Sequence, residues 1–460
     1  MLKIQTRVQQ QVPQEQEQVP VETLFELYQK VFYAGYFEQL GQELGIKIGK
    51  RIFNWMAVIY GMILQRLSSK GTQHAAVADL IPVLRKFSDH KRVIENTVSA
   101  NPGGFNRARG GIPMNVVERS FDHLFESLHS EGGGVFNGRA AFLLDGSSVT
   151  LEPTPELLEA YPPAHNQHGV SHWPIMRVVA AHDLKTGLAI RPVWGPMYGP
   201  KAVSEQQLAD LLITRLPSGS AIVGDRNFGI FATAYKALQT GHPVVLRLTE
   251  ARACALAGLG LNCGTDLRVR WKPSACDRKS RPNLPADAQI SGRLLVQRIE
   301  QDGKPVKLYV FTTCEEPADE ILAVYHLRWN IETDLRSLKR TVRLHALSSE
   351  TPEMVHKELV MGVAAYNLVH AFIEAAAQKA GLEPRELSFS HAQDHVYAAL
   401  PALMSATSPQ EIKERMQHLL RLIASCKLPK RKKRRSYPRK VWTRRRSFPT
   451  HPTKDQSIND

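Results

Sequence analysis

The spacing of apolar residues changes twice along the chain, and these changes constrain the fold more than any other feature. From Val21 to about Leu128 apolar residues recur every three or four positions, a spacing that predicts helices. From Gly138 they form short runs such as AAFLLD, AIVGD and PVVLRL, which predict buried strands. Helical spacing returns near Pro317. We therefore expect an all-helical N-terminal domain followed by an α/β domain.

The order of the predicted elements favours a mixed sheet flanked by helices. The predicted helices EQQLADLLITRL and AYKALQ lie before and after the strand AIVGD, and strands joined through helices need crossovers, so this half should be parallel. The segments IMRVVAAHDL and LAIRPVW, joined by the turn KTG, should pair antiparallel. Strand-like runs between about Thr249 and Thr313 indicate a β-rich insertion. The Gly-rich stretch NPGGFNRARGG is expected to be a linker that exposes Arg107 and Arg109.

A basic C-terminal tail carries most of the net charge. Residues 427–446 hold twelve Lys or Arg and no acid, so of the formal charge of +15 the other 440 residues carry only +3. Tyr437, Trp442 and Phe448 lie among or just beyond these cations, a composition that suits a nucleic-acid backbone because each bound cation releases a counterion. The alternative is a solvated charge run that only aids solubility, and in a nucleated cell KRKKRR would also resemble a nuclear address.

The remaining composition predicts a soluble, cytoplasmic protein. The longest uncharged apolar run, Ile52 to Gln65, has fourteen residues between two arginines, which is too short for a membrane span and predicts a buried helix. The Gln-rich first twenty residues lack the pattern of a signal peptide and are expected to be disordered. The five cysteines form no Cys-x-x-Cys pair, which argues against a disulfide framework and a zinc knuckle.

Two aspartates follow predicted strands and could bind metal ions. Asp145 is predicted to end the strand AAFLLD before a turn at Gly146-Ser147-Ser148, and Asp225 to end AIVGD. In open α/β sheets ligands bind outside the carboxyl ends of the strands, so two acids there can converge. Converging carboxylates are what hard divalent cations need, and two such ions can drive phosphodiester transfer. Either aspartate alone would be weak evidence, because Asp commonly follows a strand as a turn residue or helix cap.

The predicted helix after Pro317 supplies a third acid among cations. At about 100° per residue, one face within an arc of roughly 80° holds a polar series beside an apolar stripe: Tyr325, Arg328, Glu332, Arg336 and Lys339. On an ordinary helix such a series is a solvated face with i, i+4 ion pairs. Beside two strand-end aspartates, Glu332 could share the metal ions, while Arg328 and Lys339 could hold phosphates.

These residues resemble the signature of a known family. The spacing Tyr325-x2-Arg328-x3-Glu332-x6-Lys339 is similar to the Y-R-E-K signature of insertion sequence 4 family DDE transposases. LLDGSS around Asp145 and GDRNFG around Asp225 resemble the first and second catalytic aspartate motifs of that family, in the expected order. The resemblance covers roughly residues 138–376.

The resemblance implies a fold and an activity. It implies a ribonuclease H-like catalytic domain interrupted by a β-rich insertion, with Asp145, Asp225 and Glu332 as catalytic acids that hold two Mg²⁺ or Mn²⁺ ions. It further implies binding of double-stranded DNA, both transposon-end inverted repeats and target DNA, by a homodimer. Hydrolysis would expose a 3′-hydroxyl, and strand transfer into the target would follow. No ATP is expected, because no Gly-rich phosphate loop is present.

The predicted organisation has seven parts. In chain order they are a disordered Gln-rich lead (1–20), a helical terminal-repeat-binding domain (21–135), the first part of the catalytic domain (136–248), a β-rich insertion (249–316), the second part of the catalytic domain (317–400), a C-terminal helix (401–425) and the basic tail (426–460).

Two further sets of residues invite a functional interpretation. In related enzymes a Trp in or near the insertion helps to extrude a base, and Trp271 is the one Trp of this insertion; plain packing is the alternative. His165, His168 and His172 lie in a stretch expected to be a loop, where a zinc site is a minor alternative.

Two rival functions remain open at this stage. One is a metal-dependent nuclease of the same fold that lacks strand transfer. The other is a non-catalytic DNA-binding regulator of transposition that uses the helical domain and the basic tail.

Overall fold

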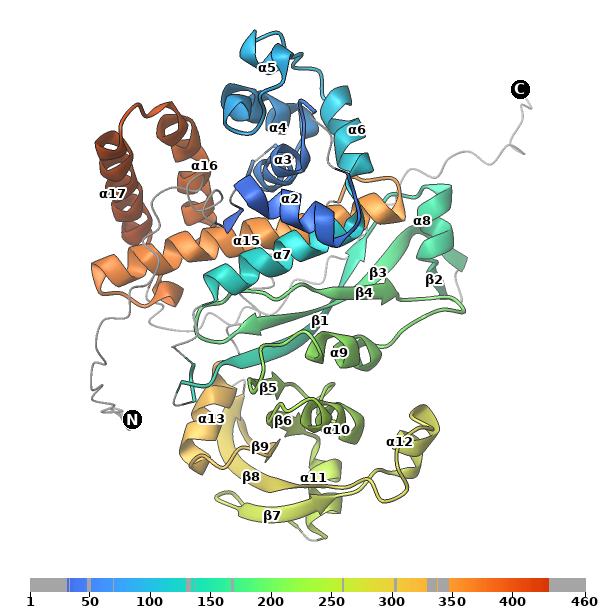
Figure 1. The fold of residues 1–460 in the computed structure, drawn as a ribbon. Helices are drawn as coiled ribbons and strands as arrows, with labels where there is room; N and C mark the ends of the chain where they lie inside the picture. Colours follow the sequence, from blue (N-terminus) through green and yellow to red (C-terminus); the bar gives the residue numbers. More distant parts are fainter. Residues whose placement is uncertain are drawn as a thin grey trace, which may run out of the picture.

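The computed structural model describes residues 31–32, 34–47, 51–68, 70–129, 134–136, 138–166, 169–258, 260–301, 304–328, 337 and 347–429. In this part of the chain a helical N-terminal region and C-terminal helices lie on one side of a large mixed sheet (Figure 1). The coarse prediction of a mixed α/β protein with an all-helical leading region is confirmed.

The N-terminal region is helical as expected. Its elements are α2 (Ala34–Glu43), α3 (Trp55–Leu67), α4 (Gln73–Leu80), the 3-10 helix η1 (Ile81–Lys86), α5 (Lys91–Ile94), α6 (Gly103–Gly111) and α7 (Met114–Leu128). The side chain of Asn54 caps α3 by accepting a hydrogen bond from the Ala57 N–H at 2.9 Å. Every residue of α3 from Ala57 onward is buried, which confirms the predicted buried helix.

The prediction of a Gly-rich linker with two exposed arginines is wrong. The stretch forms helix α6. Arg107 is exposed, but Arg109 is buried because its guanidinium contacts the carboxylate of Glu358, 249 residues further along the chain. Local composition cannot reveal such a partner.

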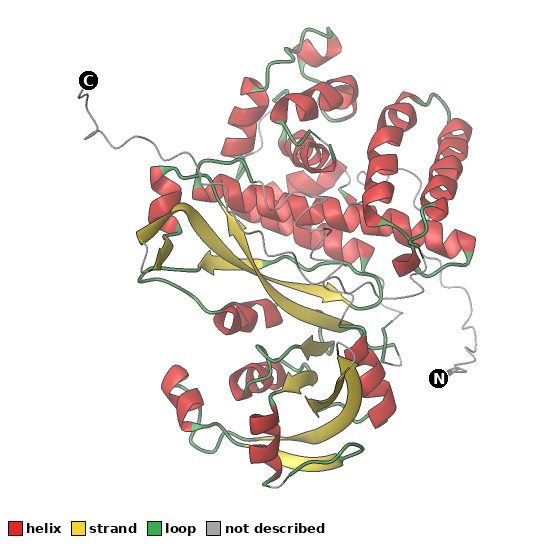
Figure 2. Ribbon diagram, turned by 180° about the vertical axis from the view of Figure 1, so that it is seen from behind, coloured by secondary structure: helices red, strands yellow, loops and turns green. Residues whose placement is uncertain are grey.

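Nine strands form one sheet among the residues described. They are β1 (Ala141–Thr150), β2 (Pro163–Asn166), β3 (Gly169–Asp183), β4 (Val193–Pro196), β5 (Ala221–Gly224), β6 (Val244–Leu248), β7 (Asp266–Trp271), β8 (Ile290–Gln301) and β9 (Lys304–Thr312). Their order is β2-β3-β1-β5-β6-β9-β8-β7, with β4 paired to β3. The strands β1, β5 and β6 are parallel, and β3 and β4 are antiparallel, as expected. The β-rich region continues the same sheet, because β9 pairs with β6 (Figure 2).

Helices cover both faces of this sheet and complete the helical region. They are α8 (Pro155–Ala160), α9 (Glu205–Ile213), α10 (Phe231–Gln239), α11 (Glu250–Ala257), α12 (Ala275–Ser280), α13 (Ala318–His326), α15 (Pro352–Ala380), η3 (Pro384–Glu386), α16 (Phe389–Ser405) and α17 (Pro409–Ser425). Alternation along β1 divides the core. Phe142 and Leu144 belong to the large cluster that contains α9, α10 and α15, whereas Leu143 belongs to a smaller cluster with Val324 and Tyr325 of α13.

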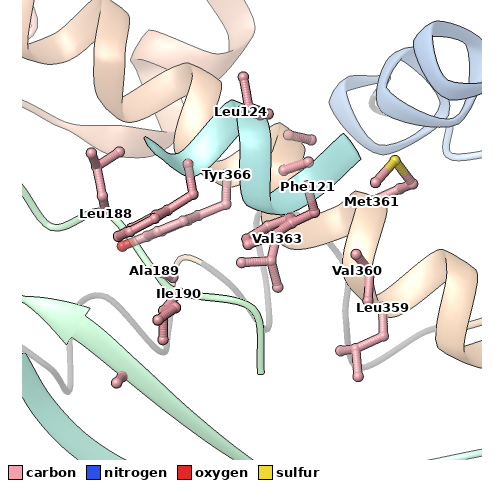
Figure 3. Packing of buried hydrophobic residues seen from close by; sticks show 14 of the residues in the cluster. Phe121, Leu124, Leu188, Ala189, Ile190, Leu359, Val360, Met361, Val363 and Tyr366 are labelled. Atoms are coloured by element: carbon pink, nitrogen blue, oxygen red, sulfur yellow. The ribbon is translucent and has the colours of Figure 1, made fainter. Parts of the chain in front are cut away.

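Helix α15 joins the helical region to the sheet. Its length and apolar character would suffice to cross a membrane, but 83% of its most apolar window is buried inside the protein, as in the core helix of a folded domain. Figure 3 shows Phe121 and Leu124 of α7 and Val363 and Tyr366 of α15 packed together with the segment 188–190 that follows β3. The helical region and the sheet therefore share one apolar core.

Two local predictions are wrong in this part of the fold. Asp145 does not end a strand: β1 continues to Thr150, because residues 146–150 pair with β3. His165 and His172 do not lie in a loop but on the hairpin formed by β2 and β3, while His168 lies outside the described residues.

Candidate active site

Asp145 and Asp225 lie side by side on neighbouring strands, just beyond the last residues at which β1 and β5 pair, a position we call the acidic edge. Leu143 of β1 is the register partner of Val223 of β5, so the two aspartates, each two positions further along, are level with each other. Side chains alternate along strands, so both carboxylates point to the face of Leu143 and Val223, which α13 covers. The structure therefore brings together two acids that are far apart in the sequence.

A tight turn holds Asp225 against β6. The backbone N–H of Asn227 donates to Oδ1 of Asp225 at 2.8 Å, and the Gly229 N–H donates to the Asp225 carbonyl at 2.9 Å. A Cβ placed on Gly229 would lie 2.0 Å from the carbonyl oxygen of Arg247, so only glycine fits there. The sequence DRNFG thus fixes the position of Asp225.

Tyr325 of α13 and Arg328, which follows the end of that helix, lie near these acids. Tyr325 is buried, and its backbone carbonyl accepts a hydrogen bond from the Arg328 N–H at 3.0 Å. Burial raises the pKa of Tyr325; the positive charges of Arg328 and Arg247 oppose this rise, and Asp225 adds to it. Tyr325, Arg328, Arg247 and Asp225 are thus close enough to influence one another.

Asp145 has the clearest electrostatic anomaly of the site. Burial, followed by the neighbouring carboxylates of Asp225 and Glu205, raises its pKa to about 6. The backbone N–H of Gly146, which donates to Oδ1 of Asp145 at 2.8 Å, and the charge of Arg328 oppose the rise. The site therefore concentrates negative charge, a charge distribution that a divalent cation would relieve.

The donor set fits a hard divalent cation in part. Carboxylate oxygens are the ligands that Mg²⁺ and Mn²⁺ prefer, and Asp145 and Asp225 supply them from one face. On the same face of β1, Oγ of Ser147 is buried and has no hydrogen-bond partner among the residues the structure describes. Within that part of the chain no three His, Cys, Asp or Glu side chains could hold a metal ion together. A complete site would therefore need a further ligand.

Three residues of the predicted polar helix face lie outside the described part of the chain: Glu332 and Lys339 of the signature, and Arg336. Tyr325 and Arg328 of the same series are described, and both lie beside the aspartates.

Two comparisons place the chain in a family. Residues 137–368, half of the chain, match the family model described as "Transposase DDE domain". The chain is also 30% identical over 366 residues to the transposase InsG for insertion sequence element IS4 of Escherichia coli (strain K12), an alignment that covers 78% of this chain and 80% of that protein. The chain belongs to the insertion sequence 4 family of DDE transposases. The resemblance found from three short motifs is thereby confirmed.

In this transposase the range matched by the family model, residues 137–368, contains all the site residues described above. It begins before β1 and ends within α15, so it includes Asp145, Asp225 and the position of Glu332. Enzymes of this type act on DNA, and the family generally uses divalent metal ions. At the acidic edge, Asp145 and Asp225 present two of the carboxylates that such ions prefer.

Trp271 lies away from the surface of the transposase. Only 4% of the residue is exposed, and its ring packs edge-on against Phe311 at 4.8 Å and Phe231 at 6.0 Å between centroids. The prediction of Trp271 as a DNA contact is therefore not supported, because a ring enclosed by core side chains cannot reach a base without local unfolding. Trp271 is packed in the core, as the alternative interpretation of this residue expects.

Sequence reasoning missed three side chains of the site. Glu205 was included only in a predicted helix, Asn227 only in a motif, and Arg247 only in a strand. A glycine inside a strand often marks a close approach by another group, so Gly146 was the available signal for Glu205. Arg247 could have been found from the parallel register, because it is level with Asp225.

Proposed function

We propose that this transposase cleaves phosphodiester bonds at the ends of its element and joins the freed ends to target DNA by a cut-and-paste route. The observation that carries the proposal is the position of Asp145 beside Asp225, just beyond the last paired residues of the parallel strands β1 and β5, close to Tyr325 of α13 and to Arg328, which follows that helix. The strand arrangement and the family match support a ribonuclease H-like catalytic domain, interrupted by the β-rich region 249–316.

Asp145, Asp225 and Glu332 would hold two Mg²⁺ or Mn²⁺ ions. When bound, the ions would activate the attacking oxygen and stabilise the leaving oxygen. The protein side chains position the substrate: Arg328 lies next to Asp145 and can hold a phosphate beside the scissile bond. Lys339 and Arg336 would extend this contact along the backbone.

The helical N-terminal region would bind DNA through a basic cavity. This cavity has a volume of about 650 Å³, and the residues that line it include Arg51, Arg92, Arg107 and His90. None of the described residues that line it is acidic. Three guanidinium groups around a cavity without a counter-ion suit the phosphates of a DNA backbone. This supports a terminal-repeat-binding role for residues 21–135.

The proposal also covers the basic tail, the assembly of two copies and the cellular location. The basic tail 426–460 would add sequence-independent affinity for DNA, because cations on such a tail contact phosphates and not bases. Residues 317–400 would complete the catalytic domain; the predicted C-terminal helix 401–425 corresponds to the end of α16 and to α17 (Pro409–Ser425). Two copies would assemble on two element ends, in the bacterial cytoplasm and associated with the nucleoid.

Two assays with the full chain test the proposal. The first uses a plasmid that carries the gene with its flanking DNA, and measures nicking with Mg²⁺ by wild type and by Asp145→Ala, Asp225→Ala and Glu332→Ala. Loss of nicking in all three variants is expected; retained nicking in one variant removes that residue from the site. The second supplies pre-cleaved ends with a free 3′-hydroxyl, which only a transposase joins to target DNA, whereas a nuclease does not. Binding without any cleavage would favour a non-catalytic regulator.

A further inference from the structure

Among the described residues, Glu205 is a third acidic side chain at the acidic edge, beside Asp145 and Asp225. We propose that it is a positioning residue: its carboxylate holds Asn227, and through Asn227 the carboxylate of Asp225, in the geometry that metal ions require. This inference rests on the proposed function, because it assigns Glu205 a task in the same site.

The start of α9 places Glu205 at this edge. Ser204 caps the helix: its Oγ accepts a hydrogen bond from the Gln207 N–H at 3.2 Å, and Gln207 Oε1 accepts one from the Ser204 N–H at 2.8 Å. Leu208 and Leu212 bury the other side of the helix in the core. With the cap and the buried stripe both fixed, the first turn of α9 is fixed beside β1.

Gly146 leaves the space that the Glu205 carboxylate occupies. A Cβ at position 146 would lie 2.2 Å from Cδ of Glu205 and 2.6 Å from each of its carboxylate oxygens. Any side chain at 146 would displace this carboxylate. The absence of a Cβ next to Asp145 therefore has a specific use, which is to admit a second acid from the opposite face of the strand.

Asn227 connects Glu205 to Asp225. Nδ2 of Asn227 donates to Oε2 of Glu205, while its backbone N–H donates to Oδ1 of Asp225 at 2.8 Å. Nε2 of Gln206 donates to both the backbone carbonyl of Asn227, at 3.0 Å, and its side-chain oxygen, at 2.7 Å. The amide of Asn227 is thereby oriented from both ends, although the residue itself is exposed.

One cation balances Glu205 in this arrangement. Nη1 of Arg177, on β3, lies 3.5 Å from Oε1 of Glu205. Arg177 is the register partner of Ser148, so it approaches from the strand next to β1. The charge of Glu205 also acts on Asp145, since it contributes to the raised pKa of that residue. Glu205 therefore contacts Arg177, on the strand next to Asp145, and Asn227, in the turn after Asp225.

A helix-capping role alone would make a different prediction. An acid in the first turn of a helix stabilises that helix through its dipole, whatever else the acid contacts. Glu156, in the first turn of α8, is exposed and lies outside the site, so it is the matched control for that effect. A purely structural Glu205 would behave as Glu156 does.

The test measures binding of Mn²⁺ to the full chain, by electron paramagnetic resonance, together with nicking of the plasmid. Glu205→Ala and Asn227→Ala are expected to weaken Mn²⁺ binding about tenfold, whereas Glu205→Gln, whose oxygen still accepts from Asn227, is expected to restore most of it. Glu156→Ala should bind Mn²⁺ as wild type does. Asn227 is exposed, so its variant keeps the test valid if Glu205→Ala does not fold.

Three outcomes would overturn the inference. One is unchanged Mn²⁺ binding in Asn227→Ala and in Glu205→Ala; another is a Glu205→Gln variant as defective as Glu205→Ala, since its charge would then matter and not its hold on Asn227. The third is an equal loss in Glu156→Ala. The variant Asp145→Ala separates failure of the proposed function from failure of this inference. If Asp145→Ala still binds Mn²⁺ and nicks DNA, the proposed function fails. If Asp145→Ala does neither while the Glu205 and Asn227 variants are normal, only this inference fails.

Discussion

Arg109 and Glu358 form a buried ion pair in which Nη1 and Oε1 lie 3.3 Å apart, although one residue is on α6 and the other on α15. Arg66 of α3 contacts the same oxygen at 2.9 Å. The other oxygen, Oε2, accepts hydrogen bonds from the backbone N–H groups of Ser348 and Ser349 at 3.2 and 3.3 Å. One carboxylate thus fixes the helical region to the core helix and to the chain that follows the signature segment.

Removal of Glu358 should therefore destabilise the whole protein. Glu358→Ala leaves two buried guanidinium groups without their counter-ion, which costs about 3–5 kcal/mol of unfolding free energy. Urea unfolding measures this loss. Glu95→Ala, which removes an exposed pair with Lys91, is the control and should cost under about 1 kcal/mol. Equal costs in the two variants would show that the buried pair does not connect the two regions energetically.

The basic cavity of the helical region should contribute to DNA affinity. Arg92→Ala and Arg107→Ala each remove one cation from its lining, so each should weaken binding of the element ends about tenfold and reduce the dependence of binding on salt. Fluorescence anisotropy at several salt concentrations measures both quantities. Arg421→Ala removes an exposed arginine of α17 and should have little effect. Equal effects of all three substitutions would show that the cavity contributes no more to DNA binding than any other surface arginine does.

The stability of the metal-free protein should depend on pH through Asp145. Its folded-state pKa of about 6 lies above the ordinary Asp value of 3.8, so the stability it contributes is present at low pH and is lost as pH rises through about 6. Above that pH the ionised carboxylate destabilises the metal-free fold by at most about 3 kcal/mol. Asp145→Asn should melt at a higher temperature than wild type at pH 8 in EDTA, with the difference shrinking towards pH 4. A difference independent of pH would contradict this.

Substitutions at Trp271 should affect stability and not catalysis. Trp271→Ala empties a site between Phe231 and Phe311, which costs about 3–5 kcal/mol, whereas Trp271→Phe should fold and cleave DNA at nearly the wild-type rate. Unfolding in urea and cleavage of element ends measure the two effects. If Trp271→Phe keeps its stability but accumulates uncut second strands, Trp271 extrudes a base after all.

Much of the sheet could be predicted from local pattern. The strand that precedes Asp225 is a continuous apolar run with helices on both sides, so its burial, its parallel pairing and the position of its acid follow from short-range rules. The start of the signature is equally local, because the apolar spacing after Pro317 predicts the helix α13 that carries Tyr325.

Residues with distant partners could not be placed in this way. Gly146-Ser147-Ser148 has the composition of a turn, but β3 extends far enough to pair with it and keeps it in a strand. Arg109 lies in a Gly-rich stretch, and only Glu358, remote in sequence, explains its burial. Glu205 came within reach of Asp145 only through the packing of α9 on the sheet. Each case depends on a tertiary contact that outweighs local preference.

The most direct test of the account is a crystal structure of the full chain with Mn²⁺, in which anomalous scattering locates the ions. We expect Mn²⁺ between the carboxylates of Asp145 and Asp225, with Glu332 as a further ligand. Mn²⁺ bound elsewhere, with the two aspartates paired only to protein side chains, would contradict the assignment of this edge of the sheet as the active site.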